Sequence, residues 1–290
     1  MGGDNRTDLH HARQVAVDVA TEAGALLRVR AQGQLGAQPK GGSGDVVTAL
    51  DLAAEDLVLR RLRAKFPTHR MVAEESGIHD ADSAWTWLVD PLDGTNNVAI
   101  GLSAYVVGLA LCFEGRPVVG VVHDPVAEQT WSAVRGAGAL GPDGPLRPAY
   151  RPTPHGPVLG WTQGHGVSRS DDTARALKLV LERHAYRLLQ LWAPLLCWVM
   201  LARGDIDGFV GYHAEAVDLP AGSLVAEEAG LVIRTLDGSP FEDSVTENAE
   251  RSFVAGHEAR IPELLELVRT AEGIRPAVGA LPLTAPAPIG

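Results

Sequence analysis

The stretch Trp87-Leu-Val-Asp-Pro-Leu-Asp-Gly-Thr-Asn96 organises the chain, because an apolar run stops in it at two carboxylates. The run 87–89 is typical of a short buried strand, and the proline and glycine that follow it are typical of a turn. We therefore expect Asp90 and Asp93 to leave the strand end close together. Such carboxylates repel each other unless a divalent cation or a proton offsets part of their charge. Taken alone, Asp93 and its neighbouring glycine could equally form an ordinary turn.

The composition restricts the class of protein. The 290 residues are 46% hydrophobic and 21% charged, which is ordinary for a globular protein, and the net charge of -11 argues against a nucleic-acid partner. No run is long enough to cross a membrane and the first residues lack an apolar leader, so we expect no membrane partner and a cytoplasmic location. Cys112 and Cys197 lie in apolar runs and are interpreted as buried thiols in a reducing compartment.

Local patterns predict helices and strands along most of the chain. Apolar residues at helical spacing indicate helices, and short apolar runs bounded by turn residues indicate strands. The Gly-rich stretch 33–45, which contains Lys40, is expected to be a mobile loop. The predicted helices are 9–30, 50–66, 171–183, 194–202, 219–229 and 262–270, and the predicted strands are 71–73, 87–89, 105–113, 118–123, 129–134, 158–161, 186–191, 206–210 and 252–255.

The domain organisation follows from a Gly- and Pro-rich stretch at 136–157. We expect an N-terminal α+β half at 1–150, which carries most of the candidate site, and a C-terminal α/β half at 151–271. Residues 272–290 are rich in proline and alanine, and we expect them to be a disordered tail.

Four carboxylates end or begin predicted elements. Glu74 follows the strand 71–73, Asp90 and Asp93 follow the strand 87–89, and Asp218 precedes a helix that has a proline in its first turn. Oxygen donors without nearby histidine or cysteine favour Mg²⁺ or Mn²⁺ over zinc. Such sites commonly bind substrate phosphate and activate water. Hydrolysis of a phosphate ester is therefore the natural inference.

Two acidic residues also have a purely structural explanation as helix caps. Asp218 could cap the helix that follows it, and Asp51 has the spacing of a capping box with Thr48. Glu74 and Glu75 are neighbours on an extended chain and face opposite ways, so we expect one to enter the site and the other to support it.

Three motifs resemble the inositol monophosphatase family, which belongs to a lithium-sensitive, metal-dependent phosphatase superfamily with fructose-1,6-bisphosphatases and bisphosphate nucleotidases. The resemblance runs from the first helix to about residue 269. It implies an α/β (α+β) fold with alternating α/β/α/β/α layers, and it implies a homodimer. The motifs are Asp45-Val-Val-Thr-Ala-Leu-Asp51 with Ala73-Glu-Glu-Ser76, the stretch 87–96, and Val217-Asp-Leu-Pro-Ala-Gly222 with Glu228-Ala-Gly230.

The resemblance also implies roles for individual residues. Thr95, with Asp51 behind it, would position the nucleophilic water, while the Gly94 and Thr95 amides would hold the phosphate. Glu75 would support the site, and Lys40 matches a basic residue on the family's mobile loop. The implied ligands of two or three Mg²⁺ ions are Glu74, Asp90, the Leu92 carbonyl, Asp93 and Asp218.

The chain departs from the family where the alcohol would bind. The segment Gln190-Leu-Trp-Ala193 replaces a Gly-Ser-Ala run, and Gly211 stands where inositol-specific members have an acidic residue. We expect Gln190, Trp192 and Gly211 to shape the substrate pocket, with Glu215 as a replacement acceptor or a solvated surface residue. The leaving alcohol therefore need not be inositol.

The resulting hypothesis is a Mg²⁺-dependent phosphomonoesterase. Its substrate would be a small phosphate ester of a polar alcohol, such as an inositol or other cyclitol, a sugar or histidinol. Two alternatives stay open: a 3'(2'),5'-bisphosphate nucleotidase, which needs a base pocket that the sequence does not identify, and a catalytically silent member that acts as a binding subunit.

Overall fold

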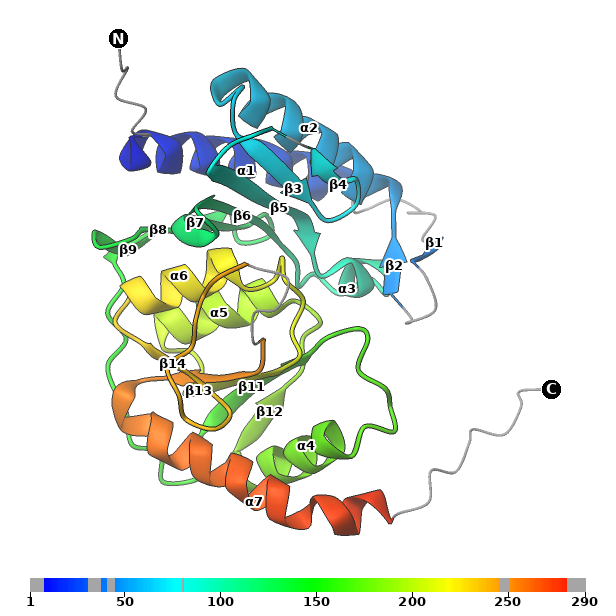
Figure 1. The fold of residues 1–290 in the computed structure, drawn as a ribbon, viewed down its shortest axis with the longest axis vertical. Coiled ribbons are helices and arrows are strands. Elements are labelled where there is room, and N and C mark those ends of the chain that lie inside the picture. The colour runs from blue at the N-terminus through cyan, green and yellow to red at the C-terminus, as the bar shows by residue number, and fades with distance from the viewer. Residues whose placement is uncertain (1–7, 31–37, 41–44, 80, 246–250, 281–290) are drawn as a thin grey trace, which may run out of the picture.

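A computed structural model describes residues 8–30, 38–40, 45–79, 81–245 and 251–280. The side chains of residues 30, 38–40 and 45–47 lie outside this description. The described elements stack in five layers: two helices, a sheet, two helices, a second sheet and two helices (Figure 1). The predicted α/β/α/β/α fold is confirmed. Within the described part of the chain, no helix combines the length and the apolar composition needed to cross a bilayer.

The first sheet has eight strands in the order β10-β9-β8-β7-β6-β5-β3-β4, all antiparallel except the parallel pair β3 and β5. One face packs on α1 (Leu9–Arg30) and α2 (Ala49–Lys65), and the other on the middle helices. The strands are β3 (Arg70–Ala73), β4 (Gly77–His79), β5 (Trp85–Asp93), β6 (Val106–Phe113), β7 (Arg116–Asp124), β8 (Gln129–Val134), β9 (Gly138–Gly141) and β10 (Gly144–Pro145).

The second sheet has five strands in the order β12-β11-β13-β15-β14, with β11 parallel to both of its neighbours. The middle helices α5 (Pro194–Arg203) and α6 (Pro220–Glu228) separate it from the first sheet, and α4 (Asp172–His184) and α7 (Ile261–Gly279) cover its other face (Figure 1). The strands are β11 (Val158–Gln163), β12 (Arg187–Leu189), β13 (Gly208–Tyr212), β14 (Val232–Thr235) and β15 (Phe253–Gly256), and η1 (Glu258–Arg260) precedes α7.

The alternation of side chains along β5 determines which face of the first sheet carries Asp90. Trp87 and Val89 are buried with α1 and α2, whereas Leu88 is buried with the middle helices. Asp90, two residues after Leu88, lies on the same face as Leu88 and so faces the middle helices. The end of β5 therefore presents the Asp90 carboxylate toward the middle helices.

Three local expectations are corrected. The strand does not stop at Asp90: β5 continues to Asp93 with an irregular register against β6 between these two residues. Part of the expected loop 33–45 is strand, because β1 (Gln38–Lys40) pairs antiparallel with β2 (Asp45–Val47). Disorder from residue 272 is wrong for 272–279, which continue α7, while 281–290 lie outside the described residues.

The stretch 136–157 contains a hairpin as well as a connection. β9 and β10 extend the first sheet as far as Pro145, and the second sheet begins at Val158. The two sheets thus fall on either side of residue 150, and the division of the chain into two halves at this residue stays a prediction.

Candidate active site

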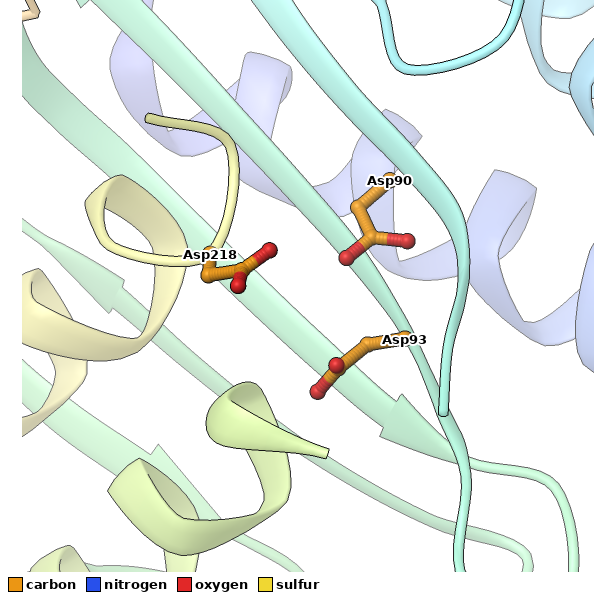
Figure 2. A group of neighbouring side chains, drawn as sticks. All are labelled: Asp90, Asp93 and Asp218. Atoms are coloured by element: carbon orange, nitrogen blue, oxygen red, sulfur yellow. The ribbon is translucent and has the colours of Figure 1, made fainter. Parts of the chain in front are cut away.

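Three aspartates from two distant parts of the chain lie together (Figure 2). Each of Asp90, Asp93 and Asp218 offers a carboxylate oxygen, and these oxygens all lie within 4.8 Å of one another. Asp90 and Asp93 are buried and Asp218 is half-buried. The arrangement joins the end of β5 to the segment just before α6, as the strand-end and helix-start pattern predicts.

Backbone amides fix two of these carboxylates. Oδ1 of Asp90 accepts a hydrogen bond from the Leu92 N–H at 3.1 Å. Oδ2 of Asp93 accepts from the Leu195 N–H at 2.7 Å, in the first turn of α5. Asp93 therefore ties the first sheet to a helix of the second half, and it satisfies an amide that the helix itself leaves unpaired.

Burial and the neighbouring carboxylates raise the pKa values of Asp90 and Asp93. Burial, followed by the negative charges of Glu74, Asp93 and Asp218, raises the pKa of Asp90 well above the usual range. Burial and then the charge of Asp218 likewise raise the pKa of Asp93. Clustered carboxylates in a dry site are costly unless positive charge or protons accompany them. This hard-oxygen donor set fits a divalent cation.

Thr95 and Asp51 form a hydrogen-bonded pair beside this cluster. The Thr95 Oγ1 lies 2.6 Å from Asp51 Oδ1 and 3.1 Å from the Leu92 carbonyl oxygen. The other oxygen of Asp51 accepts from the Thr48 N–H at 2.8 Å and from the Thr48 hydroxyl, which forms the expected capping box of α2. The helix-cap interpretation and the site interpretation of Asp51 are thus compatible, since they use different oxygens.

Gly94 occupies a position that requires glycine. Its φ of 108° lies in the left-handed region, and a Cβ there would lie 2.7 Å from the Ala104 carbonyl oxygen. It caps the short helix α3 (Thr95–Ala99), so the amides that open this helix lie next to the three aspartates.

The two neighbouring glutamates have different surroundings. Glu74 lines the same cleft as the aspartates, whereas Glu75 is not among the lining residues. Glu55, which the sequence analysis missed, is 3% exposed and accepts from the Glu75 N–H at 2.8 Å and the Ser76 N–H at 2.9 Å. The signal was present, because Glu55 follows Asp51 by four residues and so lies on the same face of α2.

An open cleft of about 490 Å³ surrounds the aspartates. The sequence analysis missed five of its lining residues: Asn96, Thr162, Gln163, His165 and Pro194. Thr162 and Gln163 are the last two residues of β11 and His165 follows the strand, and the carboxyl edge of parallel strands is a common place for ligands. The expected residues in its wall are Glu74, Asp90, Leu92, Asp93, Gly94, Thr95, Trp192 and Asp218.

The expected substrate pocket is only partly brought together. Trp192 lines the cleft, whereas Gln190 is exposed and is not part of its wall. Gly211 lies elsewhere than expected: a Cβ at this position would lie 2.2 Å from the Phe253 ring, so it faces the core of the second half.

Two further predicted site residues, Glu215 and Lys40, are not among the residues that line the cleft. Glu215 does not line the cleft, but its Oε1 accepts from the His165 N–H at 2.9 Å and so holds a residue that does. The backbone of Lys40 lies in β1, and its side chain lies outside the described residues.

Comparisons with known proteins identify the family of the chain. The model of the inositol monophosphatase family matches residues 8–272. Inositol monophosphatase 1 of Solanum lycopersicum is 31% identical over 235 residues, which are 79% of this chain and 85% of that protein. Nus factor SuhB of Pasteurella multocida is 35% identical over 199 residues, covering 67% of this chain and 73% of that protein.

Solved structures show the same fold. The extragenic suppressor protein suhB of Bartonella henselae has a TM-score of 0.79 and 26% identity, covering 89% of this chain and 98% of that one. Inositol monophosphatase from Anabaena (Nostoc) has a TM-score of 0.74 and 26% identity, covering 92% and 97%. The resemblance seen in the sequence is confirmed, and the chain belongs to the inositol monophosphatase family.

Proposed function

We propose that the protein is a Mg²⁺-dependent phosphomonoesterase, with Mn²⁺ as an alternative ion, that hydrolyses a small phosphate ester of a polar alcohol. One observation carries the proposal: Asp90, Asp93 and Asp218 meet in a cleft that also contains Thr95. Family membership supports a phosphatase. The alcohol would be an inositol or other cyclitol, a sugar or histidinol.

The cleft contains a donor set that suits hard cations. Two or three Mg²⁺ ions would be held by Glu74, Asp90, the Leu92 carbonyl, Asp93 and Asp218, all of which line it. When bound, Mg²⁺ supplies positive charge for the phosphate and lowers the pKa of water. The raised pKa values of Asp90 and Asp93 support this assignment, because burial and the neighbouring carboxylates raise them and a bound cation would offset that repulsion.

The protein's own residues would orient the reactants. A Thr95 hydroxyl that donates its proton to Asp51 turns its lone pairs outward, where they can accept a hydrogen bond from the attacking water. The Gly94 and Thr95 amides would hold the phosphate, since the first amides of a helix have no partner within the helix. Glu75 would act through its backbone, which Glu55 holds in place.

Phosphate release tests this proposal directly. The protein is assayed with cyclitol, sugar, amino-alcohol and nucleotide phosphates, in Mg²⁺ and in EDTA. We expect release from at least one monoester in Mg²⁺ and none in EDTA. Release that persists in EDTA, or no release from any ester, would contradict the proposal, and preference for a 3',5'-bisphosphate nucleotide would favour the nucleotidase alternative.

A binding role is the second candidate, because some relatives carry the name Nus factor SuhB. The cluster of site carboxylates and the Thr95–Asp51 pair favour catalysis over a silent subunit.

We also propose a cytoplasmic homodimer. Two buried free thiols, Cys112 and Cys197, suit a reducing compartment, and family membership supports the dimer. Analytical ultracentrifugation tests the assembly.

A further inference from the structure

Two aromatic rings stand at the mouth of the cleft. Among the described residues that line it, only His165 and Trp192 are exposed, while the others are buried or half-buried. Trp192 is 54% exposed, whereas the other tryptophans of the chain are buried or half-buried. Trp192 therefore presents a large, flat apolar surface at the cleft, and a ligand that covers it would remove that area from water.

The backbone at Trp192 is held in an unfavourable conformation. Its φ of 49° lies in the left-handed region, which bulky residues rarely adopt. Hydrogen bonds from the first half fix both sides of this segment: Asn97 Nδ2 donates to the Leu191 carbonyl, and Asp93 accepts from the Leu195 N–H. Strain of this kind persists only where the surroundings determine the conformation, and it concentrates at functional sites.

The cleft also has polar lining residues near Trp192, and hydrogen bonds hold part of their backbone. The backbone of His165 is fixed by its hydrogen bond to Glu215. Gln163 lines the cleft, and its Oε1 has no hydrogen-bond partner, so turning this amide toward a ligand breaks no bond at that oxygen. Pro194 adds an apolar surface next to Trp192 in the wall. The mouth thus combines a flat apolar face with groups that can pair with polar edges.

We propose that Trp192 stacks on a planar aromatic or heteroaromatic ring in the alcohol part of the substrate, and that it thereby sets specificity for ring-bearing phosphate monoesters. This inference rests on the proposed phosphatase function. Among the described residues of the cleft wall, the acidic side chains are Glu74, Asp90, Asp93 and Asp218, which are the proposed metal ligands, so this wall offers no further carboxylate to accept from the hydroxyls of a polyol. A flat ring with few donors suits this wall better, because unpaired polar groups are costly to bury.

Binding can be measured without turnover. Benzylphosphonate is titrated into the protein in Mg²⁺ while tryptophan emission is followed, with methylphosphonate as the ringless control. We expect benzylphosphonate to change the emission saturably and to protect the tryptophan from acrylamide, because Trp192 is the exposed indole. The same titration of Trp192→Phe should give no emission change. An equal response to the two phosphonates, or none to benzylphosphonate, overturns the proposal.

Kinetics test the role in specificity. The readout is the ratio of kcat/KM for benzyl phosphate to kcat/KM for ethyl phosphate. We expect Trp192→Leu to lower this ratio about tenfold and Trp192→Phe to keep most of it, because phenylalanine retains a flat ring. Tyr186→Leu is the matched control, since Tyr186 is 51% exposed and lies outside the cleft wall, and its ratio should not change.

The outcomes separate this inference from the function on which it rests. If the wild type hydrolyses neither of these two esters nor any ester of the panel above, the phosphatase proposal fails, and the phosphonate titration still decides whether Trp192 contacts a ring. If both esters are hydrolysed and Trp192→Leu leaves the ratio unchanged, the phosphatase proposal survives and the assignment of Trp192 is wrong. Circular dichroism establishes that each variant is folded.

Discussion

The Thr95 hydroxyl lies 2.6 Å from a carboxylate oxygen of Asp51, a residue 44 positions earlier in the chain. Both side chains are buried, and Asp51 is fixed from its other side by Thr48 at the start of α2. A helix cap and a candidate catalytic pair therefore share one carboxylate. The helix start determines where Asp51 points, and Asp51 determines which way the Thr95 hydroxyl points.

Thr95→Ala should remove most of the activity while the protein stays folded. The substitution deletes the hydroxyl that would orient water, and a positioned acid–base group contributes about 10²- to 10⁴-fold in rate. Thr95→Ser keeps the hydroxyl and is the matched control. Single-turnover phosphate release compares the two, and equal rates for Thr95→Ala and Thr95→Ser would show that the hydroxyl does not act in the reaction.

Asp93→Asn should lower kcat by roughly a thousandfold or more, because one formal charge is lost where cations bind. Asparagine keeps an oxygen that can accept from the Leu195 N–H, so the tie to α5 survives and the fold should be unchanged. Titration calorimetry with Mg²⁺ should show weaker binding in parallel. A folded variant with near wild-type turnover and unchanged Mg²⁺ affinity would mean that Asp93 only tethers the helix.

Without metal, rising pH should destabilise the protein through Asp90. Its pKa is raised on folding, so its stabilising contribution is complete below the pKa of an unfolded aspartate, about 4, and is lost as pH rises through the folded value. The slope is at most about 1.4 kcal/mol per pH unit for each proton.

The test compares the wild type with Asp90→Asn in EDTA over a range of pH. Thermal melts should show that the variant gains stability relative to the wild type as pH rises. Burial lowers the pKa values of His69 and His123, so these groups make the folded protein more stable as pH rises. Their contributions are the same in the wild type and in Asp90→Asn, and they cancel when the two stabilities are subtracted. Added Mg²⁺ should reduce the gap, because it binds the folded wild type. A gap that stays constant with pH would contradict the assignment.

Local sequence chemistry was enough to place the three aspartates, because a strand end and a helix start each identify their acidic residue. It failed at the β5 bulge, where proline and glycine indicate a turn although the pairing with β6 resumes between Asp93 and Val106. It also missed Glu55: the spacing of four residues places Glu55 on the face of α2 that carries Asp51, but its bonds to Glu75 and Ser76 span 20 and 21 residues and cannot be read from that spacing.

The family resemblance named Asp90, Asp93 and Asp218, which the structure brings together, and it was less useful for the alcohol half of the site. Gly211 was expected at the substrate, but its direction depends on the pairing of β13 with β15, which sets Gly211 opposite Phe253. Such a register involves residues about forty positions apart and cannot be read from either strand alone.

Gly211→Ala should therefore lower stability without changing specificity. A Cβ at this position meets the Phe253 ring at 2.2 Å, and forcing extra volume into a packed core typically costs about 1–3 kcal/mol. Urea unfolding measures the loss. The ratio of kcat/KM values across the phosphate panel should match that of the wild type. An altered ratio with unchanged stability would mean that Gly211 does contribute to the substrate pocket.

Glu55→Gln should weaken metal binding as well as the fold. Glu55 is buried, and both of its oxygens accept backbone hydrogen bonds from the segment directly after Glu74. Glutamine keeps one acceptor and turns an NH₂ group toward the other amide N–H, which leaves a buried donor unpaired. The expected loss of stability is about 1–3 kcal/mol.

The effect on function separates support of the site from ordinary stabilisation. If Glu55 fixes the direction of Glu74, Glu55→Gln should raise the Kd for Mg²⁺ by about 10- to 100-fold, as for other groups that orient metal ligands. Asp56→Asn is the control, because Asp56 is the next residue of α2 and its exposed ion pair with Arg60, 3.0 Å long, should contribute at most about 1 kcal/mol. Calorimetry on folded protein gives both affinities. A stability loss with an unchanged Kd would mean that Glu55 holds the loop without directing Glu74, and that the position of Glu74 is set by β3 and β5 alone.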